Sequence, residues 1–269
     1  MMSVVRIAIH GAAGRMGQRL VALGAADPEL QVAAAIESAS HPRLGQDAGA
    51  IAGSGELGVP LTTAQRVPAG SVDVVIDFST PAGALSALEF CLARKLPLVL
   101  ATTGFEPEQR KTVIAAAERI PILWSPSMSL AVNLAMRLSA IAGTALKNHS
   151  SGVDVEIIER HHRFKEDSPS GTALKFGEII AGVMGQTSST HGREGRPGQR
   201  PASEIGYHAV RTGDNPGEHT IIFGMLGETL ELTVRASNRD CYAQGALAAA
   251  RFLFGKPPGL YGMSDVLGL

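Results

Sequence analysis

Short apolar runs alternate with segments of helical composition through the first half of the chain. The apolar runs, which are rich in β-branched residues, cover residues 4–9, 32–36, 72–78, 98–101 and 122–124. Helices are predicted between them, over residues 18–26, 81–94 and 107–119. Strands that are apolar almost throughout are covered on both faces, and their alternation with helices indicates a parallel sheet. We therefore predict an α/β fold whose first domain is a Rossmann-like, doubly wound parallel sheet.

The pattern changes after a helix that is predicted over residues 130–146. Residues 153–159 alternate between apolar and polar side chains, which predicts a strand with one face exposed to water. A helix and a polar, glycine-rich loop follow, over residues 171–184 and 186–201. Three more strands are predicted, over residues 204–211, 219–225 and 229–236. Several strands separated by turns indicate a second α+β domain with a mainly antiparallel sheet.

The last predicted helix, residues 243–254, is apolar and rich in alanine, so we expect it to return and pack on the first domain. The first domain is therefore predicted to comprise residues 1–130 with 242–269, and the second to comprise residues 131–241. A chain of 269 residues with 45% hydrophobic residues can build two packed cores of this size.

Charge and composition exclude several classes of partner. The formal net charge is -1, whereas a nucleic-acid-binding domain is usually basic. No apolar run reaches the ~20 residues of a membrane span, and Arg6 interrupts the first apolar run, unlike a signal peptide. Cys91 and Cys241 lie far apart and show neither a disulfide framework nor metal-ligand spacing. We expect a soluble protein of a reducing compartment, without a metal site.

A glycine turn joins the first predicted strand to the first helix. Gly11, Gly14 and Gly17 form this turn, and Glu37 lies 20 residues beyond Gly17, at the end of the next strand. Such glycines let the backbone approach a pyrophosphate, the helix start supplies N–H groups, and the acid binds the adenosine ribose. The alternative is an ordinary tight connection, but the position between a strand and a helix favours a bound dinucleotide.

Polar loops follow two other strands of the first half, at residues 77–81 and 101–105. In open α/β sheets, ligands bind beyond the carboxyl ends of the strands. Both loops are therefore expected beside the nicotinamide half of the cofactor. The alternative is that Ser79 and Thr103 only cap the helices that follow, and the residue types do not separate these interpretations.

A cluster of cations precedes the helix predicted over residues 171–184. Five of the six positions from Arg160 to Lys165 are Arg, His or Lys. Histidine and lysine can exchange protons with a substrate. With Ser168 as the N-cap and Pro169 as the first helical residue, the N–H groups that follow are free to bind a carboxylate. The alternative is a solvated basic loop.

The run from Glu159 to Leu174 resembles the signature of the dihydrodipicolinate reductase family, the 4-hydroxy-tetrahydrodipicolinate reductases of lysine and diaminopimelate biosynthesis. The resemblance extends to residues 11–17, 102–105 and 217–220. It implies an oxidoreductase that transfers a hydride from NADH or NADPH to a cyclic unsaturated dicarboxylate, giving tetrahydrodipicolinate. It also implies a cytoplasmic homotetramer, assembled through the sheet of a second domain that binds the substrate.

The resemblance further assigns roles to single residues. It implies that His161 is the proton donor or acceptor and Lys165 the proton donor, while His162, Gly171 and Thr172 bind the substrate. The residues implied to bind the cofactor are Gly11, Ala12, Ala13, Gly14, Arg15, Met16, Glu37, Ala101, Thr102, Thr103, Ser125, Pro126, Ser127 and Met128.

The chain departs from the family pattern at several cofactor positions. Ser127 and Met128 stand where asparagine and phenylalanine are common, and Ala101 stands where glycine is common. Ser38 stands where some members carry an arginine for the 2′-phosphate of NADPH. Because the Glu37 carboxylate repels that phosphate, we expect NADH to be used at least as well as NADPH.

Three other functions compete with this one. A related NAD(P)-dependent dehydrogenase for another small amino or dicarboxylic acid would keep the glycine turn but lack the run over residues 161–172. A dinucleotide-sensing protein without turnover would tolerate the loss of Lys165. A nucleic-acid-binding loop is disfavoured by the net charge and by the lack of stacking side chains other than Phe164.

Overall fold

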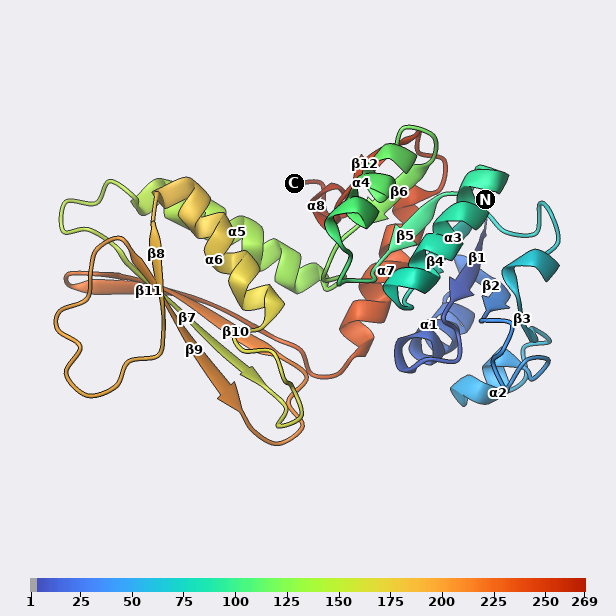
Figure 1. The fold of residues 1–269 in the computed structure, drawn as a ribbon, viewed down its shortest axis with the longest axis horizontal. Coiled ribbons are helices and arrows are strands. Elements are labelled where there is room, and N and C mark those ends of the chain that lie inside the picture. The colour runs from blue at the N-terminus through green and yellow to red at the C-terminus, as the bar shows by residue number, and fades with distance from the viewer. Residues whose placement is uncertain (1–3) are drawn as a thin grey trace. The chain divides into compact units, whose positions relative to one another are not determined.

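The computed structural model describes residues 4–269, which form two compact units (Figure 1). The first unit takes its residues from 1–130 and 239–269, and the second comprises residues 131–238. The predicted boundary at residue 242 was three residues too late. Helix α7 already begins at Asp240, whose carboxylate accepts hydrogen bonds of 2.6 and 2.9 Å from Arg19 on α1. This ion pair ties the start of α7 to the first unit.

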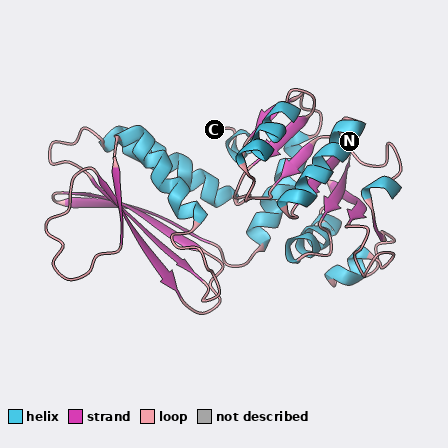
Figure 2. Cartoon of the chain, in the orientation of Figure 1, coloured by secondary structure: helices cyan, strands magenta, loops and turns pink. Residues whose placement is uncertain are grey.

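Seven parallel strands form the sheet of the first unit, in the order β12-β6-β5-β4-β1-β2-β3. These strands are labelled in Figure 1 and drawn in magenta in Figure 2. The strands are β1 (Val5–His10), β2 (Leu30–Ile36), β3 (Leu61–Thr62), β4 (Val74–Asp77), β5 (Leu98–Leu100), β6 (Pro121–Trp124) and β12 (Gly259–Tyr261). The helices are α1 (Arg15–Ala26), α2 (Ala48–Ala52), the 3₁₀ turn η1 (Ala64–Arg66), α3 (Pro81–Arg94), α4 (Pro107–Ala116), α7 (Asp240–Leu253) and α8 (Met263–Leu267). The predicted α/β class and parallel first sheet are confirmed.

Apolar layers cover both faces of this sheet. Ile7 and Ile9 of β1 pack in one cluster with residues of α1 and α7. Their neighbour Ala8 packs in the opposite cluster, with residues of α3 and α4. Because successive strand residues point to opposite faces, both sets must be apolar, which explains the nearly continuous apolar runs. Among residues 4–269, no helix is long and apolar enough to cross a membrane.

The second unit is a five-stranded sheet, in the order β11-β10-β7-β9-β8, packed against two helices. Its elements are α5 (Leu130–Leu146), β7 (Asp154–His161), α6 (Gly171–Met184), β8 (Ser188–His191), β9 (Glu204–Arg211), β10 (Glu218–Met225) and β11 (Glu228–Arg235). Strand β10 pairs antiparallel with β7 and β11, as predicted. Strands β7, β9 and β8 pair in parallel, so the sheet is mixed. The crossover through α6 returns the chain in the direction of β7.

Several elements were not predicted. The predicted loop over residues 186–201 contains the edge strand β8, whose four residues are all polar and show no apolar alternation. Elements α2, β3, β12 and α8 are two to five residues long. A pattern of period 2 or 3.6 cannot be recognised over so few residues. These elements are held by strand pairing or packing against neighbouring elements.

Two helical glycines offer a test of this packing. A Cβ added to Gly245, in α7, would lie 1.7 Å from the carbonyl oxygen of Met128. We expect Gly245→Ala to lower the free energy of unfolding by about 1–3 kcal/mol, as overpacking does. Gly182, in α6, has no atom within 4 Å of such a Cβ. Gly182→Ala is the matched control and should raise stability by up to ~1 kcal/mol. Urea unfolding followed by circular dichroism measures both, and equal stability of the two variants would contradict the packing.

Candidate active site

The turn between β1 and α1 lets a ligand approach the backbone closely. Gly11 has a φ of +80°, and a Cβ there would lie 2.7 Å from the carbonyl oxygen of Phe78. A Cβ on Gly17 would lie 2.1 Å from the carbonyl oxygen of Gly11. Helix α1 has Gly14 as its N-cap, with no side chain bound to its first amides and no acidic residue in its first turn. Its free N–H groups suit a pyrophosphate.

A cavity of about 720 Å³ opens beside this turn, and its lining includes Gly11, Ala13, Gly14 and Glu37. The amide of Ala13 donates a 2.8 Å hydrogen bond to the Glu37 carboxylate, which fixes that carboxylate just beyond β2. An acid at this position binds the ribose of a dinucleotide. The side chain of Ala12 does not line the cavity, because it is buried in the apolar cluster around α1. The residues present therefore fit the adenosine half of NAD(P).

A second cavity in the first unit, of about 260 Å³, gathers residues from distant parts of the sequence. Six of the predicted cofactor residues line it: Arg15, Met16, Ala101, Pro126, Ser127 and Met128. Arg239 and Tyr242, at the start of α7, line it too, although neither was predicted. No local motif marks these two residues, because α7 reaches this cavity only through the tertiary fold.

The other predicted cofactor residues do not line either cavity. The buried hydroxyl of Thr102 donates to the Asp77 carboxylate at 2.6 Å and so holds the end of β4. The hydroxyl of Ser125 donates to the carbonyl oxygen of Ser127 at 2.7 Å and fixes the turn after β6. The side chain of Thr103 is exposed. Thr102 and Ser125 therefore shape the loops that carry the lining residues.

The alternative interpretation of the two polar loops, in which Ser79 and Thr103 only cap the helices that follow, is wrong. Thr80, rather than Ser79, is the N-cap of α3, and Glu106, rather than Thr103, is the N-cap of α4. Each helix has a proline in its first turn, and a proline is favoured at the first helical position because its missing N–H has no partner there. Ser79 instead lines the larger cavity.

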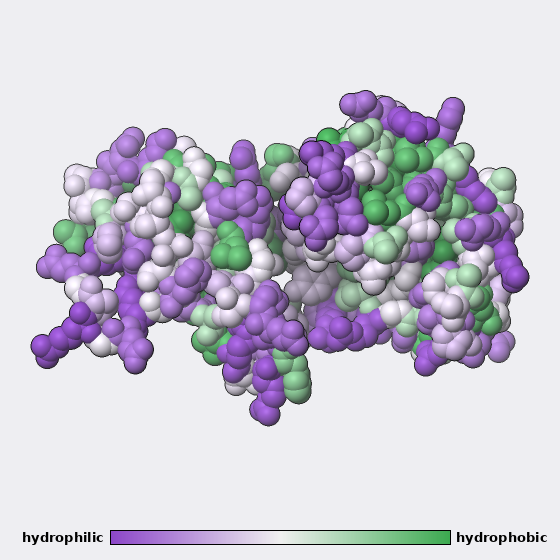
Figure 3. All heavy atoms as spheres, in the orientation of Figure 1, coloured by the Kyte–Doolittle hydropathy of each residue, from purple (hydrophilic) through white to green (hydrophobic). Residues whose placement is uncertain are grey.

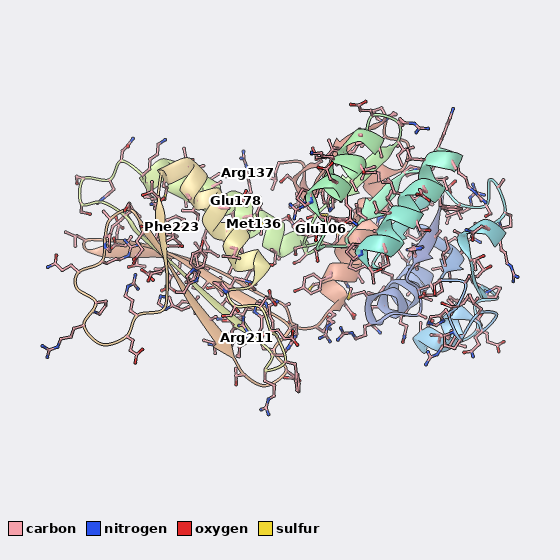
Figure 4. The ribbon with its side chains drawn as sticks, viewed as in Figure 1. Glu106, Met136, Arg137, Glu178, Arg211 and Phe223 are labelled. Atoms are coloured by element: carbon pink, nitrogen blue, oxygen red, sulfur yellow. The ribbon has the colours of Figure 1, made fainter. Side chains whose placement is uncertain are left out.

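In the second unit, the buried side chain of Glu159 on β7 receives hydrogen bonds from three directions. The Nδ1 atom of His161 lies 2.5 Å from its Oε2 atom. The guanidinium of Arg211 donates to both carboxylate oxygens, at 2.8 and 2.7 Å. The amide of Ser170 donates at 3.0 Å. The register of β7 and β9 pairs His161 with Arg211, and this pairing could not be read from the sequence. Figure 4 labels Arg211, at the end of β9.

Burial and charge set the protonation of this cluster. Burial would raise the pKa of Glu159, but the hydrogen bonds from Arg211, His161 and Ser170 outweigh it and hold that pKa below its usual value. Burial is the largest cause that lowers the pKa of His161, and together with the charges of Lys165 and Arg211 it outweighs the raising effect of Glu159. Near neutral pH, Glu159 is therefore ionised and His161 is neutral.

The helix start beside this cluster differs from the prediction. Ser170 is the N-cap of α6, so the prediction of Ser168 as the cap and Pro169 as the first helical residue is wrong. The hydroxyl of Ser170 accepts a 3.2 Å hydrogen bond from the third helical amide. Because the amide of Ser170 is bound by Glu159, a tertiary contact selects this serine as the cap. The helix begins at Gly171, as predicted.

The predicted substrate residues that follow β7 lie around the same cluster. The Nζ atom of Lys165 is 2.7 Å from the Asp167 carboxylate. This hydrogen bond from Lys165 is the main cause that lowers the pKa of Asp167. The Nδ1 atom of His162 is buried and has no hydrogen-bond partner among residues 4–269. Thr172 is the second residue of α6 and is half-buried.

The rest of the cation run belongs to the surface. The Arg160 guanidinium lies 3.6 Å from the Glu218 carboxylate, at the start of β10. Arg163 and Phe164 are exposed, so the interpretation as a solvated loop holds for this part of the run. Largely hydrophilic side chains cover the loops at this end of β7 and β9 (Figure 3). In the part of the chain that the structure describes, no cluster of three or more His, Cys, Asp or Glu side chains could hold a metal.

Comparison with known proteins covers almost the whole chain. The family model described as "Dihydrodipicolinate reductase, N-terminus" matches residues 5–128, and "Dihydrodipicolinate reductase, C-terminus" matches residues 131–267. A 4-hydroxy-tetrahydrodipicolinate reductase of Rhodopirellula baltica is 56% identical over 98% of this chain and 96% of its own, and one of Methylococcus capsulatus is 45% identical over 99% of both chains. The structure of a dipicolinate-bound dihydrodipicolinate reductase from Paenisporosarcina sp. TG-14 superposes with a TM-score of 0.77, at 26% identity, and covers 98% of this chain and 99% of its own.

The buried His219 on β10 predicts how stability depends on pH. Burial, together with the nearby His161, lowers the pKa of His219 to about 4, whereas an unfolded histidine has a pKa near 6.5. Below pH ~6.5 the unfolded chain binds a proton that the folded chain excludes. The contribution of neutral His219 to the free energy of unfolding is therefore fully present above pH ~6.5 and is lost as the pH falls toward 4. The loss amounts to ~3 kcal/mol, at 1.36 kcal/mol per pKa unit.

Urea unfolding at pH 7 and at pH 4.5 measures this effect. His219→Gln should narrow the difference in unfolding free energy between the two pH values, because glutamine does not titrate. His149→Gln, at an exposed position, is the matched control and should leave the difference unchanged. An equal pH dependence of His219→Gln and the wild type would show that His219 does not titrate as its burial requires.

Proposed function

The chain belongs to the dihydrodipicolinate reductase family and has 4-hydroxy-tetrahydrodipicolinate reductase activity, and we propose that His161 and Lys165 are its catalytic residues. In this reaction 4-hydroxy-tetrahydrodipicolinate, NAD(P)H and a proton yield tetrahydrodipicolinate, NAD(P)⁺ and water. The observation that carries the proposal is the convergence of His161 and the start of α6 on the buried carboxylate of Glu159. A proton carrier and the amides of a helix start thereby share one site.

The first unit is proposed to bind the cofactor. Enzymes of this family use NAD(P)H, whose reduced nicotinamide supplies a hydride when bound. The uncapped start of α1 at Gly14 suits the pyrophosphate, and Glu37, held by Ala13, suits the adenosine ribose. The smaller cavity, lined by Met16 and Met128, is assigned to the nicotinamide half. Ser127 is smaller than the family's common asparagine, and Met128 is more flexible than the common phenylalanine. Ser127 and Met128 both line this cavity.

The second unit is proposed to bind the dicarboxylate. Lys165 already holds one carboxylate, that of Asp167, at 2.7 Å, so it has the donor and the charge that a substrate carboxylate needs. The amide of Gly171, the first residue of α6, adds an N–H group beside it. His162 has a buried Nδ1 atom without a partner in the described chain, which makes it available to a ligand. Thr172, in the first turn of α6, is assigned to the same anion site.

The protonation states divide the proton chemistry between two residues. His161 is neutral near pH 7, because burial lowers its pKa, so it is suited to accept a proton. Lys165 carries an ammonium group, paired with Asp167, and can donate one. We therefore propose that Lys165 donates the proton that the reduction consumes. His161 is proposed to exchange protons between the site and the solvent. Assembly into a homotetramer through the second unit, and a cytoplasmic location, stay predictions.

Turnover by the pure protein tests the function. Pyruvate and aspartate semialdehyde, with the synthase that condenses them, generate the unstable substrate, and oxidation of NADH is followed by absorbance. Lys165→Ala and His161→Gln should each lower kcat by roughly 10²–10⁴-fold, the usual contribution of a general acid or base. The affinity for NADH, measured by fluorescence titration, should stay near that of the wild type, because both residues belong to the second unit.

Arg163→Ala is the matched control for these two variants. Arg163 belongs to the same run of cations but is exposed, so its removal should change kcat by less than about threefold, as expected for a surface charge. Full activity of both Lys165→Ala and His161→Gln would refute the site, and absence of turnover by the wild type would refute the function.

Cofactor preference forms a separate prediction. We expect kcat/KM with NADH to equal or exceed that with NADPH, because the fixed Glu37 carboxylate repels a 2′-phosphate. Glu37→Gln removes this charge and should shift the ratio toward NADPH by about tenfold, which corresponds to 1.4 kcal/mol. Glu56→Gln, at an exposed position of the same unit, should leave the ratio unchanged. A much higher kcat/KM of the wild type with NADPH would overturn the assignment.

A further inference from the structure

We infer that Glu159 and Arg211 are positioning residues: together they orient His161 and fix the segment between β7 and α6 that carries the other substrate groups. The inference rests on the proposed function, because it assigns these two residues to the same reaction. Neither residue is proposed to touch the substrate. Their role is to hold the groups that do.

The geometry determines which nitrogen of His161 carries the proton. An ionised carboxylate can only accept hydrogen bonds, so the contact of 2.5 Å between Glu159 and Nδ1 requires Nδ1 to be the donor. The neutral ring of His161 is thereby held in the Nδ1–H form. Its Nε2 atom keeps a lone pair and is the atom that can accept a proton. Without Glu159, the ring would lose both this tautomer and its fixed orientation.

Arg211 connects the orienting carboxylate to the following segment. Its guanidinium donates to both oxygens of Glu159 and also, at 2.7 Å, to the backbone carbonyl oxygen of Asp167. Asp167 in turn pairs with Lys165 through its side chain. One planar group therefore sets the position of His161 and of the backbone beside Lys165. A lysine at position 211 could not make these three contacts, since it lacks the rigid fork of donors.

Ser170 extends the same network to the helix that is proposed to bind a carboxylate. Its amide donates to Glu159, and its hydroxyl caps α6 and lies 3.1 Å from the Nε2 atom of His219. The Glu159 carboxylate thus determines where α6 begins and, with it, where the amides of Gly171 and Thr172 lie. Three functional parts of the site are fixed relative to one buried group.

A second glutamate on β7 provides a matched control. Glu156 lies on the opposite face of the strand, where it accepts hydrogen bonds from Arg193 at 2.7 Å and from Arg200 at 2.9 Å. His208 lies 2.7 Å from it. Both glutamates therefore bind arginine and histidine side chains, but the Glu156 cluster contains none of the proposed substrate residues. Loss of either cluster affects the sheet, whereas only the Glu159 cluster should affect the reaction.

The central test compares Glu159→Gln with Glu156→Gln under saturating NADH. We expect Glu159→Gln to lower kcat by roughly 100-fold or more, since loss of the group that orients a catalytic histidine has a large effect. Glu156→Gln should change kcat by less than about threefold.

Arg211→Lys is a second variant, in case Glu159→Gln fails to fold. It should lower kcat at least about tenfold, whereas its control Arg193→Lys should not. Circular dichroism and NADH binding identify the folded variants. An equal loss of kcat in the Glu159 and Glu156 variants would overturn the inference.

The tautomer of His161 gives a readout that does not depend on turnover. Nitrogen-15 spectra, with the signal assigned by its absence in His161→Gln, should show the Nδ1–H form in the wild type. In Glu159→Gln the amide oxygen is needed by the Ser170 amide, so the amide NH₂ group faces the ring. The signal should therefore change to the Nε2–H form. An unchanged tautomer would overturn the inference.

The pH profile of kcat/KM adds a third measurement. The groups that face His161 are Glu159 on its own strand, Lys165 after it, Arg211 on β9 and His219 on β10. Among these groups, only Glu159 favours the charged form of the His161 ring. The ionisation of His161 is identified in the profile as the one that disappears in His161→Gln. In Glu159→Gln this ionisation should occur at lower pH. If the wild type does not turn over, the proposed function fails, and the nitrogen spectra still decide the inference.

Discussion

The structure of the second unit depends on the hydrogen bonds that the buried carboxylate of Glu159 requires. The side chain of Glu159 is out of contact with water, and an ionised group in that position is stable only when charge and hydrogen bonds replace its hydration. Arg211 provides the charge, and His161 and the Ser170 amide complete the hydrogen bonds. This requirement fixes the register of β7 and β9, because a shift by one residue would move Arg211 to the other face of the sheet.

The first unit meets a different constraint, which is imposed by the backbone. Between β1 and α1 the chain passes so close to Phe78 and to itself that Gly11 and Gly17 have no room for a Cβ. The same closeness leaves the first amides of α1 without a side-chain cap and next to a cavity that Glu37 borders. One unit thus places uncapped N–H groups beside a cavity, and the other holds a histidine and a lysine through paired carboxylates.

Local patterns were sufficient for the long elements and for part of the site. Strands such as β1 and β4 are largely buried on both faces and are therefore apolar except at Arg6, His10 and Asp77, so they were recognised. The polar edge strand β8 was not recognised, because it carries no apolar residue to reveal it. The histidines and the lysine of the cation run could be named as candidates from the sequence, because chemistry of this kind is concentrated in one short segment. Ser170 was not found as the cap of α6, because Ser168 is an equally good cap by sequence.

The amino-acid pattern was enough to predict the parallel sheet of the first unit, the glycine turn and the residues that can exchange protons, because each depends on neighbouring positions. Which of these residues are held in place, and by which partners, follows from the tertiary fold. Arg211 lies 52 residues from Glu159 and reaches it through the pairing of two strands. Arg239 reaches the smaller cavity because α7 packs back onto the first sheet. Such contacts depend on register and packing, which no single segment of the chain contains.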